Sequence, residues 1–564
     1  MAIGSFVLVL HAHVPYVLRH GHWPHGEQWL FEAAAETYLP LLRVIDGVLH
    51  AGARFPVTMG LTPILLEQLS QDYFKERFAV WLAEREERAH ADEQQYEQWG
   101  DHHMAFLARR WADHFMALAA QFEAIQRDIP GAFAKHWSAG AIEIISSGAT
   151  HGYQALLLQD ASCRAQIRQG LRSSERILGR RPTGVWLPEC SWRPGGPWTP
   201  PCTFEDARLR FGTDAILAAE GVKFTFLDAH LFRGARSEGM RTPTGYRKVG
   251  WDQAGWDEGR AWRSVLEPHI ATTDGSDTGL AVFGRHPEVS EQVWSGQVGY
   301  PADGRYLEFH KKHGDNGLRY WKVTSARAGL GEKERYYPDD IDGAVFSHAQ
   351  HFCAVVRSIL RRHRERTGRH GVVVAPFDAE LFGHWWFEGP NFLRDVMLAL
   401  HQDPEVEVQT ASAYLETHPP DKVVWFPEGS WGEGGDHRVW FNETQKWMWD
   451  VIYRAEDRFG NLCYSMPWAD NPAIEAVLKR AGREILLLQA SDWPFIVHSK
   501  GAPDYGYKRF AQHASRFDRL CDLAVDLSQG REPEPYQQAI VAESDACDGV
   551  FPDIDLNLWH HEAP

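Results

Sequence analysis

Short runs of apolar and β-branched residues recur along the chain, and most are separated by segments with a helical spacing of apolar positions. Continuous apolar strands that alternate with helices are typical of a parallel α/β sheet. Seven such runs predict an α/β fold based on an incomplete (β/α)7 TIM-like barrel. A shorter run at 281–283 is a weaker eighth candidate. The expected strands are residues 6–10, 55–59, 141–145, 184–187, 222–227, 372–375 and 406–409.

Three longer segments depart from this rhythm. Residues 64–136 are charged, with apolar residues three and four positions apart, which predicts an inserted helical subdomain. Residues 233–342 are rich in Gly and Trp and far exceed ordinary loop lengths, which predicts a substrate-binding or lid region. Helical spacing returns near the C-terminus. We therefore expect a catalytic barrel over 1–415, containing both insertions, and a C-terminal all-helical domain over 416–564 that contributes to the active-site cleft.

Charge and cysteine content narrow the classes of function. The chain has 564 residues, with 58 Lys and Arg against 76 Asp and Glu, a net charge of -18. This balance disfavours binding to nucleic acid or to an anionic membrane. No apolar run reaches about 18 residues, so no membrane span is expected. The seven cysteines are scattered and form no CxxC pair, which favours reduced thiols and a cytoplasmic location.

Two carboxylates follow predicted strands and stand near tryptophan. Glu189 ends the run TGVWLPECSW, and Asp378 ends GVVVAPFD before a loop rich in Gly and Trp. Enzymes that act on glycosidic bonds use a pair of carboxyl groups. One attacks or stabilises the anomeric carbon, and the other transfers a proton. Asp378 has two close competitors, Glu380 and Glu388, and residue spacing does not choose among the three.

Histidines and tryptophans supply further candidate contacts. His11 and His13 share parity on the first strand, so both side chains are expected on one face. They indicate either polar support for a substrate or a metal site completed by His151, His230, His384 or Asp378. Asp492 precedes a tryptophan in the helical region. Many of the 24 tryptophans lie in Gly- and Pro-rich loops, where they favour a groove that stacks on sugar rings.

Several segments together resemble glycoside hydrolase family 57. HAHVPYV, EIISSGATHGY, WLPECSW, APFDAELFGHWWFEG and QASDWPF are similar to its five signature regions, in the same order over nearly the whole chain. VFGRHPEVSEQVWSGQVGYPAD and FPEGSWGEGGDHRVW further resemble the 1,4-α-glucan branching enzymes of the family. The resemblance implies a retaining α-glucan-active enzyme with an incomplete (β/α)7 barrel.

The resemblance also implies residue roles. Glu189 matches the nucleophile and Asp378 the general acid/base, and neither a metal nor another cofactor is implied. The other positions that match substrate contacts are His11, His13, Trp23, His151, Arg285, Trp294, Ala302, Trp431, Trp440 and Asp492. Two departures stand out. GYPAD replaces the family's GYPGD at Ala302, and the loop expected to carry a lid tyrosine is lengthened, with Tyr246 as its best match.

We therefore expect a branching enzyme that cleaves α-1,4 linkages and forms α-1,6 branches by a double displacement, with an α-1,4-glucan as donor and acceptor. The alternatives are a 4-α-glucanotransferase or α-amylase of the same family, a metal-dependent amidohydrolase or deacetylase, and a catalytically inactive glucan-binding protein. The expected state is a monomer or a small homo-oligomer, without a nucleic-acid or membrane partner.

Overall fold

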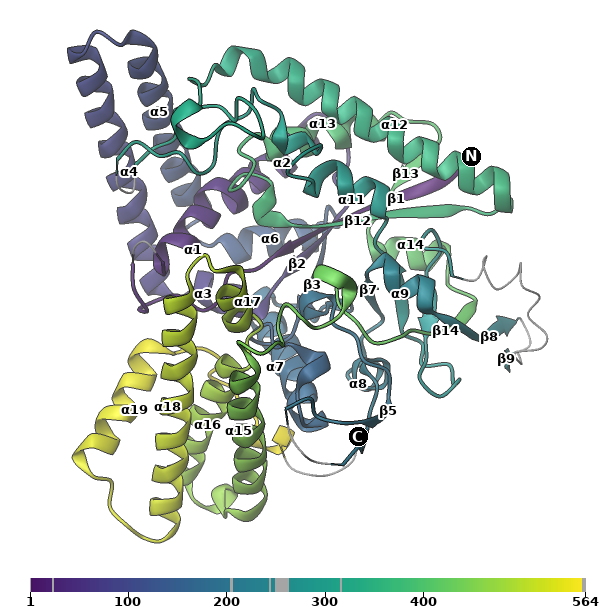
Figure 1. The fold of residues 1–564 in the computed structure, drawn as a ribbon, viewed down its shortest axis with the longest axis vertical. Helices are drawn as coiled ribbons and strands as arrows, with labels where there is room; N and C mark the ends of the chain where they lie inside the picture. Colours follow the sequence, from purple (N-terminus) through teal and green to yellow (C-terminus); the bar gives the residue numbers. More distant parts are fainter. Residues whose placement is uncertain are drawn as a thin grey trace.

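The computed structural model describes residues 2–22, 25–202, 206–242, 245–248, 263–314 and 317–559 (Figure 1). Strand β1 (Gly4–Ala12) lies at the centre of a parallel sheet, between β12 (Gly371–Asp378) and β2 (Val57–Leu61). β3 (Glu143–Ser147) and β4 (Val185–Trp186) continue the sheet beyond β2. Every residue of β1 is buried, as expected of a parallel strand covered on both faces.

A second sheet contains β7 (Phe224–Leu227) and β11 (Ala281–Gly284), which pair in parallel. Isolated parallel bridges, Gly184 with Phe224 and Arg285 with Val374, link β4 to β7 and β11 to β12. The parallel pairing therefore passes from one sheet into the other at both places. The rest of this sheet is β10 (His269–Ala271), β14 (Lys422–Trp425), β8 (Arg236–Thr242) and β9 (Gly245–Lys248), with a small separate hairpin of β5 (Gly196–Trp198) and β6 (Arg208–Arg210).

The structure contains strands that were not expected, such as β8, β10 and β14, and it gives two of the expected runs different places. The weak candidate at 281–283 is β11, which pairs with β7 and is bridged to β12, whereas the expected strand at 406–409 is the short β13 (Val406–Val408). β13 pairs only with the first residues of β1, from Gly4 to Phe6. β11 has only four residues, so its apolar run is short and its sequence signal is weak.

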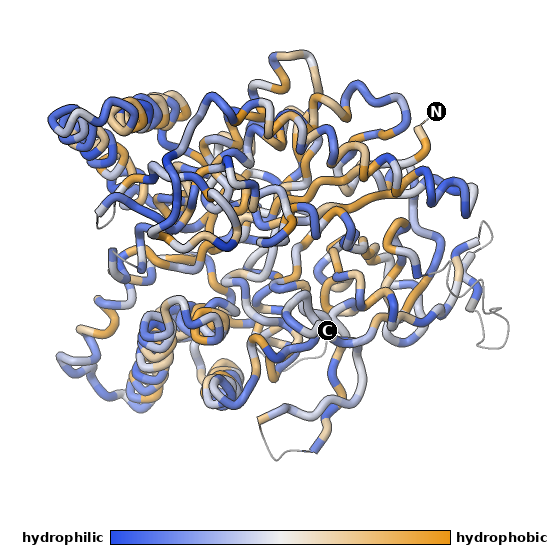
Figure 2. Tube along the Cα trace, turned by 45° about the horizontal axis from the view of Figure 1, so that its top comes forward, coloured by the Kyte–Doolittle hydropathy of each residue, from blue (hydrophilic) through white to orange (hydrophobic). Residues whose placement is uncertain are grey.

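Helices surround the strands, and the apolar residues concentrate in the interior (Figure 2). The longest helix of the upper layer, α12 (Ile341–Thr367), runs along β1 and β12 in Figure 1. The others around the strands are α1 (Glu27–Ala33), α2 (Leu39–His50), α3 (Pro63–Ser70), α6 (Ile129–Ser138), α7 (Asp160–Leu178), α8 (Thr213–Ala219), α9 (Ala229–Gly234), α11 (Pro287–Trp294), α13 (Gly389–His401) and α14 (Ala411–Thr417).

Two long helices, α4 (Asp72–Gln98) and α5 (His102–Ala124), pack against each other and project at one edge of the molecule (Figure 1). Their contact is aromatic, with the Phe78 ring 4.9 Å from Phe122 and Trp81 6.0 Å from Phe115, centroid to centroid. Asp101 caps α5 by accepting a hydrogen bond from the Met104 amide. The central part of the interval 64–136, from Asp72 to Ala124, therefore forms a helical hairpin with its own apolar seam.

The C-terminal helices form a bundle at the bottom of Figure 1. A buried polar network joins this bundle to the segment that follows β1. Asp548 accepts from Arg516 and is 2.7 Å from His20, and Arg509 donates to the Tyr16 carbonyl. The bundle consists of α15 (Lys446–Ser465), α16 (Pro472–Leu488), α17 (Asp492–Ser499), α18 (Pro503–Ser528) and α19 (Pro535–Cys547).

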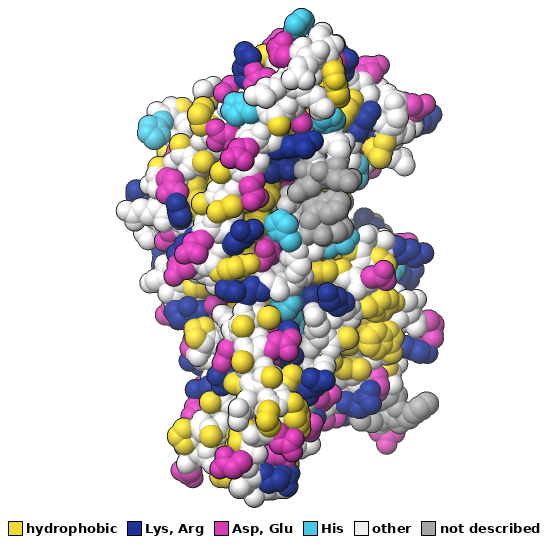
Figure 3. Space-filling view, turned by 90° about the vertical axis from the view of Figure 1, so that its left-hand side faces the viewer, with side chains coloured by type: hydrophobic (Ala, Val, Ile, Leu, Met, Phe, Trp, Pro, Cys, Tyr) yellow, Lys and Arg dark blue, Asp and Glu magenta, His cyan; other side chains and the backbone are white. Residues whose placement is uncertain are grey.

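The surface carries both signs of charge side by side. Figure 3 shows Lys and Arg interspersed with Asp and Glu over one face of the molecule. Among the described residues, no helix has the length and apolar content needed to cross a bilayer.

Candidate active site

The candidate residues meet where parallel strands end. His11 pairs with Asp378 in the register of β1 and β12, which places the two residues side by side. His151 follows β3, Glu189 follows β4, and Arg285 follows β11. Carboxyl ends of parallel strands point to the same edge, and loops at that edge carry the chemistry of α/β enzymes. Residues far apart in the sequence are thereby brought together.

Glu189 lies in a turn whose backbone is strained. Its φ is 60°, and that of Cys190 is 50°, which is the left-handed region that residues with a Cβ seldom occupy. The turn is held by hydrogen bonds from the Cys190 amide to the Leu187 carbonyl at 2.9 Å and from the Trp431 amide to the Glu189 carbonyl at 3.0 Å. His151 also has a positive φ, of 59°. Strained backbone of this kind tends to gather at functional sites.

Each oxygen of the Glu189 carboxylate accepts one side-chain hydrogen bond. Trp431 Nε1 donates to Oε2 at 2.8 Å, and Ser491 Oγ donates to Oε1 at 3.0 Å. Burial raises the pKa of Glu189 to about 7, and the two donors oppose that rise. The side chain is 15% exposed, so it is enclosed yet reachable from the cleft. The two donors prepare the carboxylate to act as an anion.

Asp378 is the only one of the three competing carboxylates without a protein donor among the described residues. Glu380 Oε1 accepts from the His13 amide at 3.0 Å and from the Tyr38 hydroxyl at 2.5 Å. Glu388 Oε1 accepts from the Leu307 amide at 3.1 Å and the Tyr336 hydroxyl at 2.8 Å. Burial, together with the charges of Glu380 and Glu189, raises the pKa of Asp378 well above its usual value. Its raised pKa and the absence of a donor among the described residues both suit proton transfer by Asp378.

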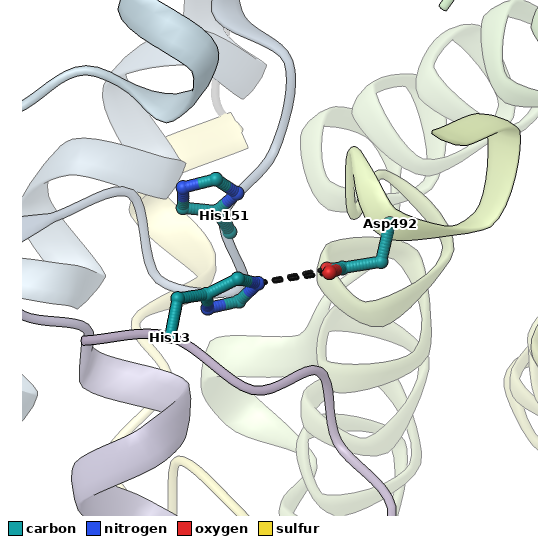
Figure 4. A group of neighbouring side chains, drawn as sticks. All are labelled: His13, His151 and Asp492. Atoms are coloured by element: carbon teal, nitrogen blue, oxygen red, sulfur yellow. Dashed lines mark hydrogen bonds and ion pairs between the residues drawn. The ribbon is translucent and has the colours of Figure 1, made fainter. Parts of the chain in front are cut away.

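The histidines form a stack beside Glu189. The His13 ring lies 4.0 Å from that of His151, inclined by 19°, and Figure 4 shows one ring above the other. His11 Nε2 is 3.0 Å from His151 Nε2. Burial holds the pKa of His11 and of His151 well below the usual value, so both are neutral. Burial lowers the pKa of His13, but Asp492, Glu380 and Glu189 together outweigh burial, and the net shift is upward.

His13, His151 and Asp492 are close enough to suggest a metal site, since one potential ligand atom from each lies within 4.8 Å of the others. The arrangement does not fit a metal well. The lone pairs of stacked imidazoles lie in parallel planes and do not converge on one ion. The ring nitrogens of both histidines also have protein partners. They are Asp492 at 3.0 Å and Thr62 at 3.1 Å for His13, and His11 at 3.0 Å and Ser491 at 2.8 Å for His151.

Arg285 and two tryptophans line the other side of Glu189. Arg285 Nη2 is 2.8 Å from Asp228 Oδ2, and its guanidinium lies 5.7 Å from the Trp431 ring centroid. Trp294 lies 6.5 Å from Trp431, edge to face. A fixed cation beside aromatic faces suits a polyhydroxylated ligand, because it combines hydrogen-bond donors with stacking surfaces.

Two other expected contacts, Trp440 and Tyr246, are not brought into this cluster. Trp440 is 1% exposed, with its ring 4.8 Å from Tyr153, so no open face remains for a sugar. Tyr246 lies on the β8–β9 hairpin at the edge of the molecule, away from α17 in Figure 1, and its hydroxyl donates to the Gly275 carbonyl at 2.6 Å. Ala302 ends a short 3₁₀ helix, Tyr300–Ala302. Trp23 lies outside the described residues.

Ser491 is a site residue that sequence reasoning missed. It lies between Glu189 and His151 and is fully buried. The only signal was its place beside Asp492 in QASDWPF, where a serine before a helix is most simply explained as a helix cap. The α17 start shows no such side-chain cap bond.

Comparison with known proteins gives matches over the whole chain. Residues 7–427 match the pattern of glycosyl hydrolase family 57, and residues 451–559 match that of the 1,4-alpha-glucan branching enzyme C-terminal region. The chain is 37% identical to a 1,4-alpha-glucan branching enzyme of Thermococcus kodakarensis, over 100% of this chain and 79% of that protein.

Two solved structures are similar along their full length. The branching enzyme from Pyrococcus horikoshii aligns with a TM-score of 0.88 at 35% identity, covering 100% of this chain and 98% of that one. The alpha-amylase AmyC from Thermotoga maritima aligns with a TM-score of 0.80 at 28% identity, covering 100% of both chains.

Proposed function

The chain belongs to glycosyl hydrolase family 57, and we propose that it is a 1,4-alpha-glucan branching enzyme, which cleaves an α-1,4 linkage and rebuilds it as an α-1,6 branch. The observation that carries this proposal is the full-length match to branching enzymes, which includes the C-terminal region over 451–559. The pair of Glu189 and Asp378 at one edge of the sheet supplies the required chemistry.

The first displacement breaks the α-1,4 linkage. Asp378, whose pKa is raised by burial and by the charges of Glu380 and Glu189, donates a proton to the glycosidic oxygen, while Glu189 attacks the anomeric carbon and forms a covalent glycosyl–enzyme. The leaving chain departs with a free 4-hydroxyl. The carboxyl groups of Glu189 and Asp378 should lie about 5–5.5 Å apart, as in retaining glycosidases.

The second displacement sets the product. Asp378, now ionised, takes the proton from the 6-hydroxyl of an acceptor glucose, which attacks the anomeric carbon and releases Glu189. Two inversions retain the α configuration. Water competes for the same intermediate, so transfer depends on holding the acceptor and closing the cleft. The role of Tyr246 as the lid residue stays a prediction. In this structure its hydroxyl donates to the Gly275 carbonyl and not to a residue of the site.

The neighbouring residues are assigned to glucan binding. The His13–Asp492 pair, in which His13 Nε2 lies 3.0 Å from Asp492 Oδ1, offers both donors and acceptors to sugar hydroxyls. Arg285 with Trp431 and Trp294 forms a second wall. His11, His151 and Ala302 complete the proposed set of contacts, with Trp23 as a further candidate, whereas Trp440 is left out because its ring is buried.

We further infer an incomplete (β/α)7 barrel from β1, β2, β3, β4, β7, β11 and β12. Parallel ladders and the two isolated bridges support a closed order of these strands. The proposed division is a catalytic barrel over 1–415, with the helical subdomain 64–136 and the substrate or lid region 233–342, followed by the helical domain 416–564. The family patterns, which end at 427 and begin at 451, support a boundary in this part of the chain.

All seven cysteines are free thiols, which supports the proposal of a reducing, cytoplasmic compartment. An α-1,4-glucan serves as donor and acceptor in this proposal. A monomer or small homo-oligomer is the proposed state.

Incubation with amylose should lower the iodine colour and create α-1,6 linkages, with little increase in reducing ends. Branching shortens the linear segments that bind iodine, while each cleavage is followed by transfer. Linkage analysis by NMR and a reducing-end assay measure both quantities. Reducing ends that rise in proportion to the colour loss would instead assign hydrolysis, as in an alpha-amylase. New α-1,4 chain lengths without α-1,6 linkages would indicate a 4-α-glucanotransferase.

Exhaustive chelation should leave this activity unchanged, because the stacked histidines near Glu189 bond to protein partners and no step uses a metal ion. The measurement compares iodine-based rates before and after dialysis against a strong zinc chelator, with elemental analysis of the protein. Loss of activity that added zinc restores would favour the metal-dependent amidohydrolase or deacetylase alternative.

A further inference from the structure

A chain of hydrogen bonds runs from strand β1 to the carboxylate of Glu189. We propose that His11, His151 and Ser491 form a directional relay that holds Glu189 ionised and aimed, with Ser491 as a positioning residue supplied by the C-terminal helical bundle. The proposal rests on the proposed function, in which Glu189 is the nucleophile. Successive distances are 3.0 Å from His11 to His151, 2.8 Å from His151 to Ser491, and 3.0 Å from Ser491 to Glu189.

Hydrogen-bond counting gives the relay one direction when Glu189 is ionised. A carboxylate only accepts, so the single hydroxyl hydrogen of Ser491 is directed at Oε1. Ser491 Oγ must then accept from His151 Nδ1–H. Because neutral His151 carries one ring hydrogen, its Nε2 accepts from His11 Nε2–H. This assignment leaves His11 Nδ1 as a bare lone pair, and that atom has no hydrogen-bond partner among the described residues.

The far end of the relay favours this direction. If Glu189 were protonated and donated to Ser491, every hydrogen would reverse and His11 Nδ1 would carry a buried N–H. Among the described residues this nitrogen has no acceptor, and it lies next to Gly60, where an added Cβ would be 3.3 Å from it. An unsatisfied buried donor is rarer and costlier than an unsatisfied lone pair. The relay therefore stabilises the ionised form of Glu189.

Ser491 reaches Glu189 because the bundle docks on the loop after β3. The Ser491 amide donates to the His151 carbonyl at 3.0 Å, and Gly152 forms an antiparallel bridge with Ala490. His151, in the loop after β3, thus contacts both the backbone amide and the hydroxyl of Ser491. Trp431 supplies the donor to the other oxygen, so the two carboxylate oxygens are held by different parts of the chain.

Other groups also set the charge of Glu189. Burial and the charge of Asp492 raise the pKa of Glu189, whereas Trp431, Ser491 and His13 lower it, and the net result is a pKa of about 7. The titratable groups around Glu189 are His13, His151, Tyr153, Cys190, Asp378 and Asp492. Removal of the Ser491 hydroxyl takes away one lowering contribution and leaves these others in place.

Ser491→Ala should therefore shift the acidic limb of the kcat/KM profile to higher pH by about one unit, with about a tenfold loss of kcat/KM below neutrality. A raised pKa means that Glu189 becomes protonated at a higher pH, so activity is lost earlier as the pH falls. The measurement is kcat and KM on amylose across pH, with kcat expected to carry most of the loss. Ser491→Thr, which keeps the hydroxyl, should return the limb toward its original position.

Ser499→Ala is the matched control, because Ser499 is an exposed serine of the same helix whose hydroxyl only bonds the Ile496 carbonyl. Thermal melting of all variants separates loss of fold from loss of function. A Ser491→Ala acidic limb that coincides with the wild-type limb overturns the relay, whether or not the rate falls. A limb that stays displaced in Ser491→Thr overturns it too. If the wild-type protein forms no α-1,6 linkages, that result contradicts the proposed branching activity and not the relay.

Discussion

Replacing Glu189 by glutamine should reduce branching of amylose on the order of 10⁴-fold or more, the scale seen when an enzyme loses its nucleophile. The amide cannot form the covalent intermediate, so both displacements stop. Its NH₂ group would also face one of the two donors, Trp431 Nε1 or Ser491 Oγ, that bond the carboxylate. Kinetic assay of α-1,6 linkage formation measures the loss, and unchanged binding of a maltooligosaccharide would place the defect in the chemical step.

Glu388→Gln is the matched control for this variant. Glu388 is also buried, and burial also raises its pKa to about 7, but its Oε1 accepts from the Leu307 amide and the Tyr336 hydroxyl. Glutamine keeps a carbonyl acceptor there, so we expect a far smaller loss. Turnover by Glu189→Gln at a rate close to wild type would remove Glu189 from the nucleophile role.

Replacing Asp378 by asparagine should lower the rate on amylose about 10²- to 10⁴-fold, the range for a lost general acid. The leaving glucan then departs without a proton. An α-maltosyl fluoride donor should react in the first step regardless, because fluoride needs little help to leave. With no base to activate the acceptor, the glycosyl–enzyme should accumulate on Glu189. Mass spectrometry of the intact protein and of its peptides would detect this adduct.

Glu380→Gln serves as the comparison for Asp378. Glu380 accepts from the His13 amide and the Tyr38 hydroxyl, so it is expected to position β1 and not to exchange a proton with the substrate. Its variant should form no adduct with the fluoride donor beyond the wild-type level. An adduct that accumulates in Glu380→Gln, but not in Asp378→Asn, would transfer the acid/base role to Glu380.

The positions of many strands could be predicted from the apolar runs in the sequence. Each of the eight apolar runs overlaps a strand, because a strand buried on both faces must be apolar throughout. The order of the strands did not follow in the same way. β11 was the weakest run and yet pairs with β7 and bridges to β12, while β14 (Lys422–Trp425) was not expected at all. Short strands carry too few residues for their periodicity to be distinctive.

Sequence alone determined the family, since its signature segments keep their order, and the full-length match confirms that membership. It also placed Glu189, Asp378 and the histidines at strand ends, because apolar runs show where strands stop. Tertiary structure decided what their side chains meet. Within the described residues, it left Asp378 without a donor while Glu380 and Glu388 accept hydrogen bonds. It also covered the ring of Trp440 and brought Ser491 to Glu189 from 302 residues away. Such contacts depend on how distant segments pack, and local patterns do not encode that packing.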